Sequence, residues 1–213
     1  LALQPVGANI GRFFELIALF PNSTFSAIVD NAGIITTISE MASSKKITVP
    51  LFIDLNTGMN RTGAAPNQDT ADLCQLISKD SNLIFRGIHA YDGHIRNTNI
   101  KDRKRVCDAA FDLVSAFKTT LEKKGITVAT IVMGGSPTFP IHAQRKDVEA
   151  SPGTTLLWDE RYGTSFPDMK FFHAAVLLTR VISKPSSNVI CLDLGHKSIA
   201  PEIDVQRVKI FGL

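Results

Sequence analysis

The sequence predicts an α/β fold of the TIM-type (β/α) barrel class, incomplete at its N-terminus in this chain and followed by part of a β domain. Three observations predict it. Apolar runs of strand length alternate with helical stripes through about 150 residues, which is the pattern of βα units around a parallel sheet. Polar, glycine-rich segments follow the apolar runs, as in barrels whose strand-end loops form a site. Beyond residue 155, β-rich runs continue without a long amphipathic helix.

The barrel elements are expected in a regular order. Apolar runs predict strands at 1–7, 25–29, 47–53, 83–88, 128–133 and around Val148. Stripes with the i, i+3, i+4 spacing predict helices around 10–17, 34–42, 73–77 and 106–121. These strands are fewer than the eight of a closed barrel, and the chain opens in mid-pattern without Met. We therefore expect the first strands to precede Leu1.

The change of pattern divides the chain into two domains. We assign residues 1–155 to most of the barrel and residues 156–213 to the beginning of a C-terminal β domain. The β-rich runs of the second domain are 171–182, 188–194 and 208–211.

Composition narrows the functional classes. The chain has 213 residues, 44% of them hydrophobic, and its net charge of +3 comes from scattered basic residues, so nucleic-acid binding is not expected. Its three cysteines lie far apart and match neither a disulfide framework nor a zinc motif, which favours the cytoplasm. No apolar run reaches the roughly 18 residues of a membrane span, so no membrane partner is expected.

The segment LFIDLNTGMNRTG, residues 51–63, is the strand end around which the chemistry is expected. Gly58 and Gly63 give the backbone freedom on either side of Arg61, so the guanidinium can be aimed across the end of the sheet. The alternative is a structural arginine that pairs with a nearby acid.

Two later strand ends carry glycines and hydroxyls. GGSPTF, residues 134–139, combines two glycines for close backbone approach with Ser136 and Thr138, and this combination suits a phosphate. ASPGTT, residues 150–155, adds a second loop of the same kind at the next strand end. Each loop by itself is more typical of an ordinary turn, but two neighbouring loops favour a phosphate site.

HAYDGH, residues 89–94, follows a third strand. His89 and Tyr91 lie on the same side because side-chain direction alternates along a strand, and the planar Tyr91 ring could face a cofactor ring. His89 and His94 could suggest a metal, but Asp92 is the only acid nearby and no third ligand is obvious, so satisfied polar residues are favoured over a zinc site.

Taken together and in this order, GMNRTG, GIHAYDGH, GGSPTF and SPGTT resemble the D-threonine aldolase and D-serine dehydratase group of pyridoxal-phosphate enzymes, which shares its barrel with alanine racemases. The resemblance implies pyridoxal 5'-phosphate at the barrel mouth and a homodimer in the full-length protein. It implies that Arg61 lies near the cofactor's phenolic oxygen and Tyr91 beside its ring. The residues that it assigns to the phosphate are Gly135, Ser136, Thr138, Gly153 and Thr154.

The chain departs from the family pattern at several positions. The family's Schiff-base lysine would lie upstream of Leu1, and Lys197, in the β region, does not replace it. No metal ligands are assigned within this chain, and a divalent metal, if used, would be bound beyond Leu213. Racemase relatives often carry Arg where Ser151 stands, which argues for lyase chemistry over racemisation.

The resulting functional prediction is a pyridoxal-phosphate-dependent lyase acting on D-3-hydroxy amino acids. D-Threonine aldolase-like cleavage to glycine and an aldehyde is preferred. A D-serine dehydratase-like deaminating lyase, an amino-acid racemase and a non-catalytic pyridoxal-phosphate-binding homologue are the alternatives.

Overall fold

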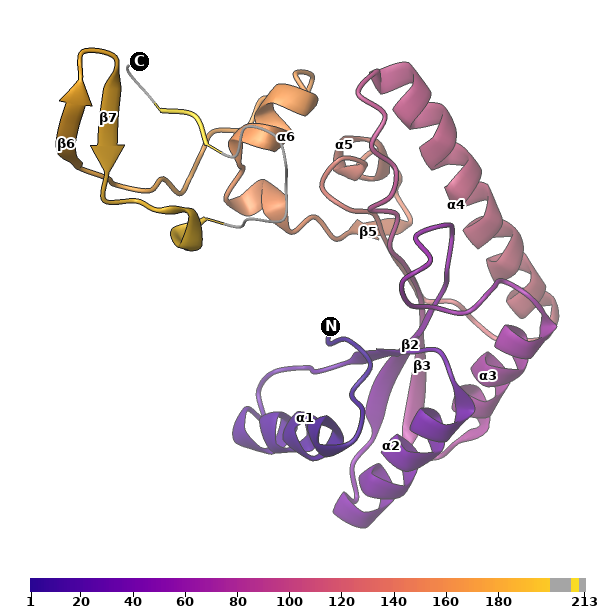
Figure 1. Cartoon of the computed structure of the whole chain (residues 1–213). Helices are drawn as coiled ribbons and strands as arrows, with labels where there is room; N and C mark the ends of the chain where they lie inside the picture. The colour runs from indigo at the N-terminus through magenta and orange to yellow at the C-terminus, as the bar shows by residue number, and fades with distance from the viewer. Residues whose placement is uncertain (200–207, 211–213) are drawn as a thin grey trace. The chain divides into compact units, whose positions relative to one another are not determined.

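The structure, a computed structural model, describes residues 1–199 and 208–210. The chain divides into two compact units, Leu1–Pro152 and Gly153–Leu213. Each unit has secondary structure of its own kind (Figure 1).

A five-stranded parallel sheet forms the centre of the first unit. Its strands are β1 (Ala27–Val29), β2 (Val49–Asp54), β3 (Leu83–Ala90), β4 (Thr130–Met133) and β5 (Val148–Ala150). They lie side by side in chain order, so each strand pairs with the next one along the sequence. A parallel sheet with this sequential order is a segment of a (β/α) barrel wall, and the predicted fold class is confirmed. Of the strand expected at 1–7, only a single bridge between Ala2 and Ala27 forms.

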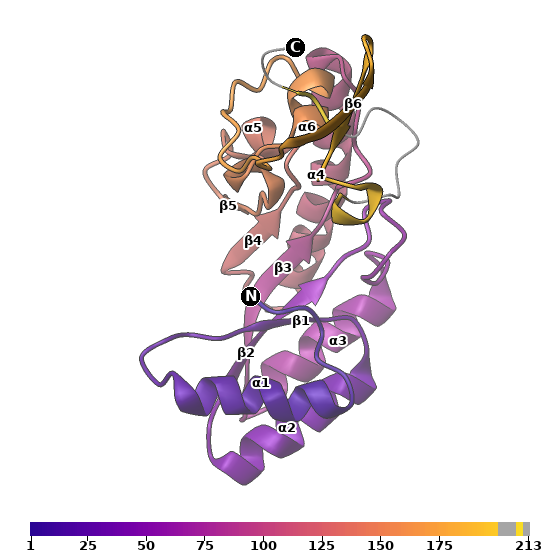
Figure 2. The ribbon, with the colours of Figure 1, turned by 60° about the vertical axis from the view of Figure 1, so that its left-hand side comes forward.

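Helices connect the strands. They are α1 (Ala8–Leu19), α2 (Ala32–Lys45), α3 (Gln68–Lys79), α4 (Ile100–Lys123) and the short α5 (Phe139–His142). The side chains of Asn31, Asn67 and Asn99 cap α2, α3 and α4 by accepting backbone N–H groups of the first turn. Figure 1 shows these three capped helices along one side of the sheet, and Figure 2 shows α4 behind β3 and β4.

The sheet buries apolar residues on both faces. Leu51 and Ile53 of β2 are fully buried in the two large clusters on the helix side. Phe52 points the other way, where it packs with Ile28 of β1 and Val132 of β4. This second face corresponds to the interior of a barrel, so the interior of the present segment has an apolar floor.

A bulge in β3 changes which of its residues face the interior. Gly87 has φ +146°, and a Cβ atom there would lie 1.9 Å from the carbonyl oxygen of Thr130, so only glycine fits. The register with β2 shifts at this point, from Leu51 opposite Phe85 to Phe52 opposite Gly87. Because one extra residue reverses the alternation, His89 faces the interior.

The second unit contains short elements. These are η1 (Thr154–Leu156), α6 (Glu160–Ser165), the antiparallel pair β6 (Val181–Ser186) and β7 (Val189–Leu192), and η2 (His196–Ser198). A small cluster of Trp158, Phe166 and Met169 forms its buried centre.

The β structure predicted for 171–182 is wrong over 171–180, since β6 begins at Val181. A strand needs a hydrogen-bonded neighbour, and within the described residues no strand pairs with 171–180. Residues 208–210 are not in a strand, and the rest of that predicted run lies outside the described residues. No helix of the described residues is long and apolar enough to cross a membrane.

Candidate cofactor site at the carboxyl ends of the strands

The loops after β2 and β3 touch each other at the carboxyl end of the sheet. The Arg61 guanidinium lies 4.6 Å from the centroid of the Tyr91 ring, in a cation–π contact. A second contact joins the same loops, because a Cβ atom on Gly58 would lie 2.8 Å from Nε2 of His94. The structure therefore brings together Arg61 and Tyr91, which lie far apart in the sequence.

The turn that carries Arg61 is held by its own side chains. Oδ1 of Asn56 accepts the N–H groups of Gly58, at 3.0 Å, and Asn60, at 3.1 Å. Gly63 closes the turn with φ +92°, and a Cβ there would lie 2.8 Å from the backbone nitrogen of Asn56. The sequence assigned both glycines to backbone freedom, and in the structure Gly63 is also sterically required.

The Tyr91 ring reaches the glycine loop after β4. A Cβ atom on Gly135 would lie 3.1 Å from Cε2 of Tyr91, and one on Gly93 would lie 2.3 Å from the ring. Three loops that follow consecutive strands thus meet around this ring, and the two glycines leave room for its close approach.

Asp92 organises the glycine loop from inside the protein. Its side chain is fully buried, and Oδ1 accepts the N–H of Gly135 at 2.8 Å and the hydroxyl of Thr138 at 2.7 Å. Oδ2 accepts a hydrogen bond from Nε2 of His142 at 2.8 Å. The donors of Gly135 and Thr138 are therefore used within the protein, and the assignment of these two residues to the phosphate stays a prediction.

Ser136 differs from its neighbours in this loop. The residue is only 5% exposed, yet neither its hydroxyl nor its N–H has a hydrogen-bond partner within the described residues. The adjacent loop contributes Ser151, whose hydroxyl donates to the carbonyl of Gly134 at 2.8 Å. Ser136 is thus the residue of this loop whose donors are available to an anion.

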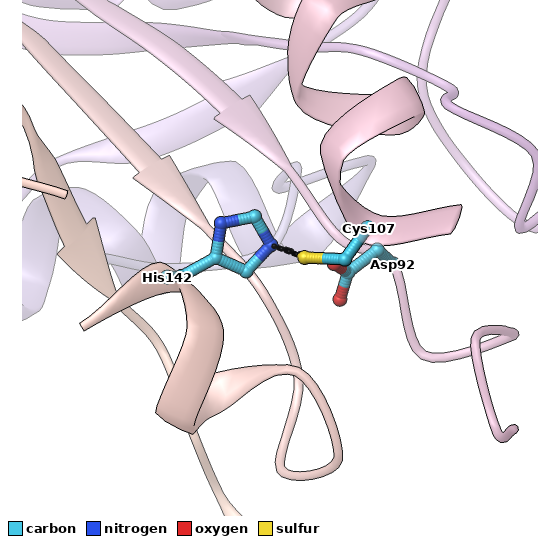
Figure 3. Close-up of side chains that lie close together, drawn as sticks. All are labelled: Asp92, Cys107 and His142. Carbon is cyan, nitrogen blue, oxygen red and sulfur yellow. Dashed lines mark hydrogen bonds and ion pairs between the residues drawn. The ribbon is translucent and has the colours of Figure 1, made fainter. Parts of the chain in front are cut away.

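Asp92, Cys107 and His142 form a group with metal-ligating atoms, all within 4.8 Å of one another (Figure 3). Arg145 donates to Nδ1 of His142 at 2.6 Å. Because an arginine can only donate, Nδ1 must accept, and in the neutral ring Nε2 then carries the proton and has no lone pair for a metal. Burial raises the pKa of Cys107 to about 11, which keeps the thiol protonated near neutrality.

This group is therefore a hydrogen-bonded network. The second terminal nitrogen of Arg145 donates to Oδ1 of Asp108 at 2.5 Å, so the network runs from Asp92 through His142 and Arg145 to Asp108 of α4. Sequence reasoning missed Cys107 and His142 because they are 35 residues apart and match no motif. The helical spacing of Cys107 with the other buried residues of α4 was the available signal.

Gly153 and Thr154 belong to the second unit. No atom lies within 4 Å of a Cβ built on Gly153, and the Thr154 carbonyl accepts the N–H of Trp158 at 2.7 Å. Their assignment to a phosphate site stays a prediction.

The fold and these loops define the class of the first unit as a parallel (β/α) barrel segment with a polar cluster at the carboxyl ends of its strands. Residues 14–160 match the family "Alanine racemase, N-terminal domain". The chain belongs to this family.

The sequence identity to individual relatives is about a quarter. The chain is 25% identical over 181 residues to D-threonine aldolase from Arthrobacter sp., covering 83% of this chain and 48% of the relative. It is 23% identical over 199 residues to 3-hydroxy-D-aspartate aldolase from Paracoccus denitrificans, covering 89% and 51%. Among solved structures, D-threonine aldolase from Filomicrobium marinum matches with a TM-score of 0.83 and 24% identity, over 95% of this chain and 55% of that one. The chain thus spans about half the length of these relatives.

Proposed function

We propose that the full-length protein is a pyridoxal-phosphate-dependent lyase that cleaves D-3-hydroxy amino acids in the manner of a D-threonine aldolase. The observation that carries the proposal is the meeting of Arg61, Tyr91 and the Gly135 loop at the carboxyl ends of consecutive strands. The similarity to aldolases of D-hydroxy amino acids supports this reaction class.

The residues present fit pyridoxal phosphate. Arg61 offers a planar cation for the phenolic oxygen, and the Tyr91 ring lies beside the guanidinium. The unpartnered N–H and hydroxyl of Ser136 suit the phosphate. The assignment of Gly153 and Thr154 to the phosphate is supported by the family resemblance alone. Thr57 supplies a further polar atom, because its buried hydroxyl has no partner within the described residues. When bound, the cofactor supplies the electron sink for breaking a bond at the substrate's α-carbon.

Ser151 favours lyase chemistry over racemisation. A serine side chain is neutral, so this position offers no positive charge to a cofactor ring. Its hydroxyl donates to the carbonyl of Gly134. The resemblance to the aldolase and dehydratase group supports the remaining proposals, which concern the full-length protein. These are a Schiff-base lysine before Leu1, any divalent-metal ligands beyond Leu213, and a homodimer. A cytoplasmic location is proposed from the three widely separated cysteines.

Substitution of Arg61 in the full-length protein tests the proposal. Arg61→Ala should lower catalytic efficiency on D-threonine roughly ten- to a hundred-fold, because a charge-assisted hydrogen bond contributes about 1.5 to 3 kcal/mol. Arg61→Lys should do less harm, since it keeps the charge but loses the planar fork. The matched control is Arg12→Ala, on the exposed surface of α1.

Absorbance titration with pyridoxal phosphate and turnover would be measured on the same preparations. A wild-type protein that binds no pyridoxal phosphate contradicts the proposed function. Normal cofactor spectrum and turnover in Arg61→Ala would remove Arg61 from the site.

A further inference from the structure

We propose that Asp54 and His89 form an acid–base pair of this active site, in which Nε2 of His89 exchanges a proton with the bound substrate and Asp54 positions the imidazole. The inference rests on the proposed function. It concerns two side chains that the motif assignments left without a role.

The two residues are brought together by the β3 bulge. Asp54 is the last residue of β2, and after the register shift at Gly87 it stands opposite His89. If the register of Leu51 with Phe85 continued unbroken, Ile88 would stand there instead. A glycine that no other residue can replace thus places an imidazole next to a carboxylate.

The contact between them is short and sheltered. Nδ1 of His89 lies 2.6 Å from Oδ1 of Asp54, and the side chains are 13% and 4% exposed. A carboxylate accepts, so Nδ1 carries the proton, and in the neutral ring Nε2 keeps its lone pair. Nε2 has no hydrogen-bond partner within the described residues. The pair therefore presents an oriented proton acceptor.

The acceptor lies on the face of the sheet where a barrel site is built. Ile88 and Ala90, on either side of His89, belong to the core on the helix side, so His89 points to the interior. The interior floor beneath it is apolar and consists of Ile28, Phe52 and Val132. An imidazole above an apolar floor is shielded from bulk water, which strengthens its electrostatic pairing with Asp54.

The proton transfers balance without an additional reactant. In aldol cleavage, the proton of the substrate's 3-hydroxyl passes to Nε2 of His89 while the oxygen forms the carbonyl of the aldehyde product. The electron pair of the broken carbon–carbon bond stays with the α-carbon. The imidazolium, paired with Asp54, then returns the proton to that carbon to complete glycine.

The tautomer of His89 gives a test that does not require activity. Nitrogen NMR of full-length protein with labelled histidines, five of which lie in this chain, would be recorded, and His89 identified as the signal missing from His89→Gln. A pyrrole-type Nδ1 and a pyridine-type Nε2 are expected. Asp54→Asn should shift the ring toward Nε2–H, because the amide can donate to Nδ1. A wild-type ring protonated at Nε2 overturns the proposal.

Kinetics give the second test. His89→Gln should lower kcat about 10²- to 10⁴-fold while KM and the spectrum of bound pyridoxal phosphate stay unchanged, and Asp54→Asn should lower kcat in the same way. The control is Asp112→Asn, at an exposed position of α4. Full kcat in His89→Gln, in a protein that binds the cofactor and cleaves D-threonine, refutes the acid–base pair and leaves the proposed function standing. If His89→Gln does not fold, the effect of Asp54→Asn on kcat and the wild-type tautomer still decide.

Discussion

Replacing Asp92 by Asn should destabilise the protein severely although it changes only one atom of the side chain. The carboxylate accepts hydrogen bonds from Gly135, Thr138 and His142, all buried. In Asp92→Asn, an amide nitrogen would replace one of the two oxygens. This nitrogen can only donate, so it would face one of the groups that now donate to the carboxylate. The imidazole of His142 cannot adapt by changing tautomer, because Arg145 already donates to its Nδ1.

The magnitude follows from these contacts. One charge-assisted hydrogen bond is lost outright, which costs about 1.5 to 3 kcal/mol. The other two become neutral hydrogen bonds, each weaker by about 1 kcal/mol. The sum is about 3.5 to 5 kcal/mol.

Urea unfolding of Asp92→Asn and wild type, compared at equal slope, measures this free energy. Asp112→Asn, on the exposed face of α4, should change it by no more than about 0.5 kcal/mol. Adding Arg145→Met to Asp92→Asn should recover part of the loss, because His142 can then accept from the amide. A loss below about 1 kcal/mol in Asp92→Asn would show that the buried network does not hold the loop as described.

Three further outcomes are expected. Gly87→Ala should lower the melting temperature strongly, with a loss of about 3 kcal/mol or more, because its Cβ would meet the Thr130 carbonyl at 1.9 Å and its φ is +146°; an unchanged melting temperature would contradict the bulge. Burial raises the pKa of Cys107 to about 11 and of Cys74 to about 12 from 9.0. Unfolded thiols therefore release protons first, and stability should fall from pH 9 toward pH 11 by about 1.4 kcal/mol per pH unit for each thiol, so Cys74→Ala should flatten the pH dependence measured by urea unfolding. Gly153→Asp should abolish binding of pyridoxal phosphate in an absorbance titration of the full-length protein, because the carboxylate repels the phosphate, and unchanged affinity would remove this loop from the site.

The sequence by itself determined the class of fold and the positions of the elements that carry the site. Apolar runs located β2, β3 and β4 to within a few residues, because strands buried on both faces leave continuous apolar segments. Since the carboxyl ends of parallel strands share one edge, the sequence also placed Arg61 and Tyr91 in the same region, and their ring contact agrees with that placement. The cofactor roles of these residues stay predictions.

Only the tertiary structure decided the direction of individual side chains and the pairing of distant ones. Asp92 and His142 are 50 residues apart, and nothing local predicts that Asp92 turns inward to hold the glycine loop. The partnership of Asp54 with His89 depends on one extra residue at Gly87, because a single-residue shift reverses the alternation of a strand. Local sequence reports periodicity, whereas contacts between strands depend on register, and register is set by packing across the whole sheet.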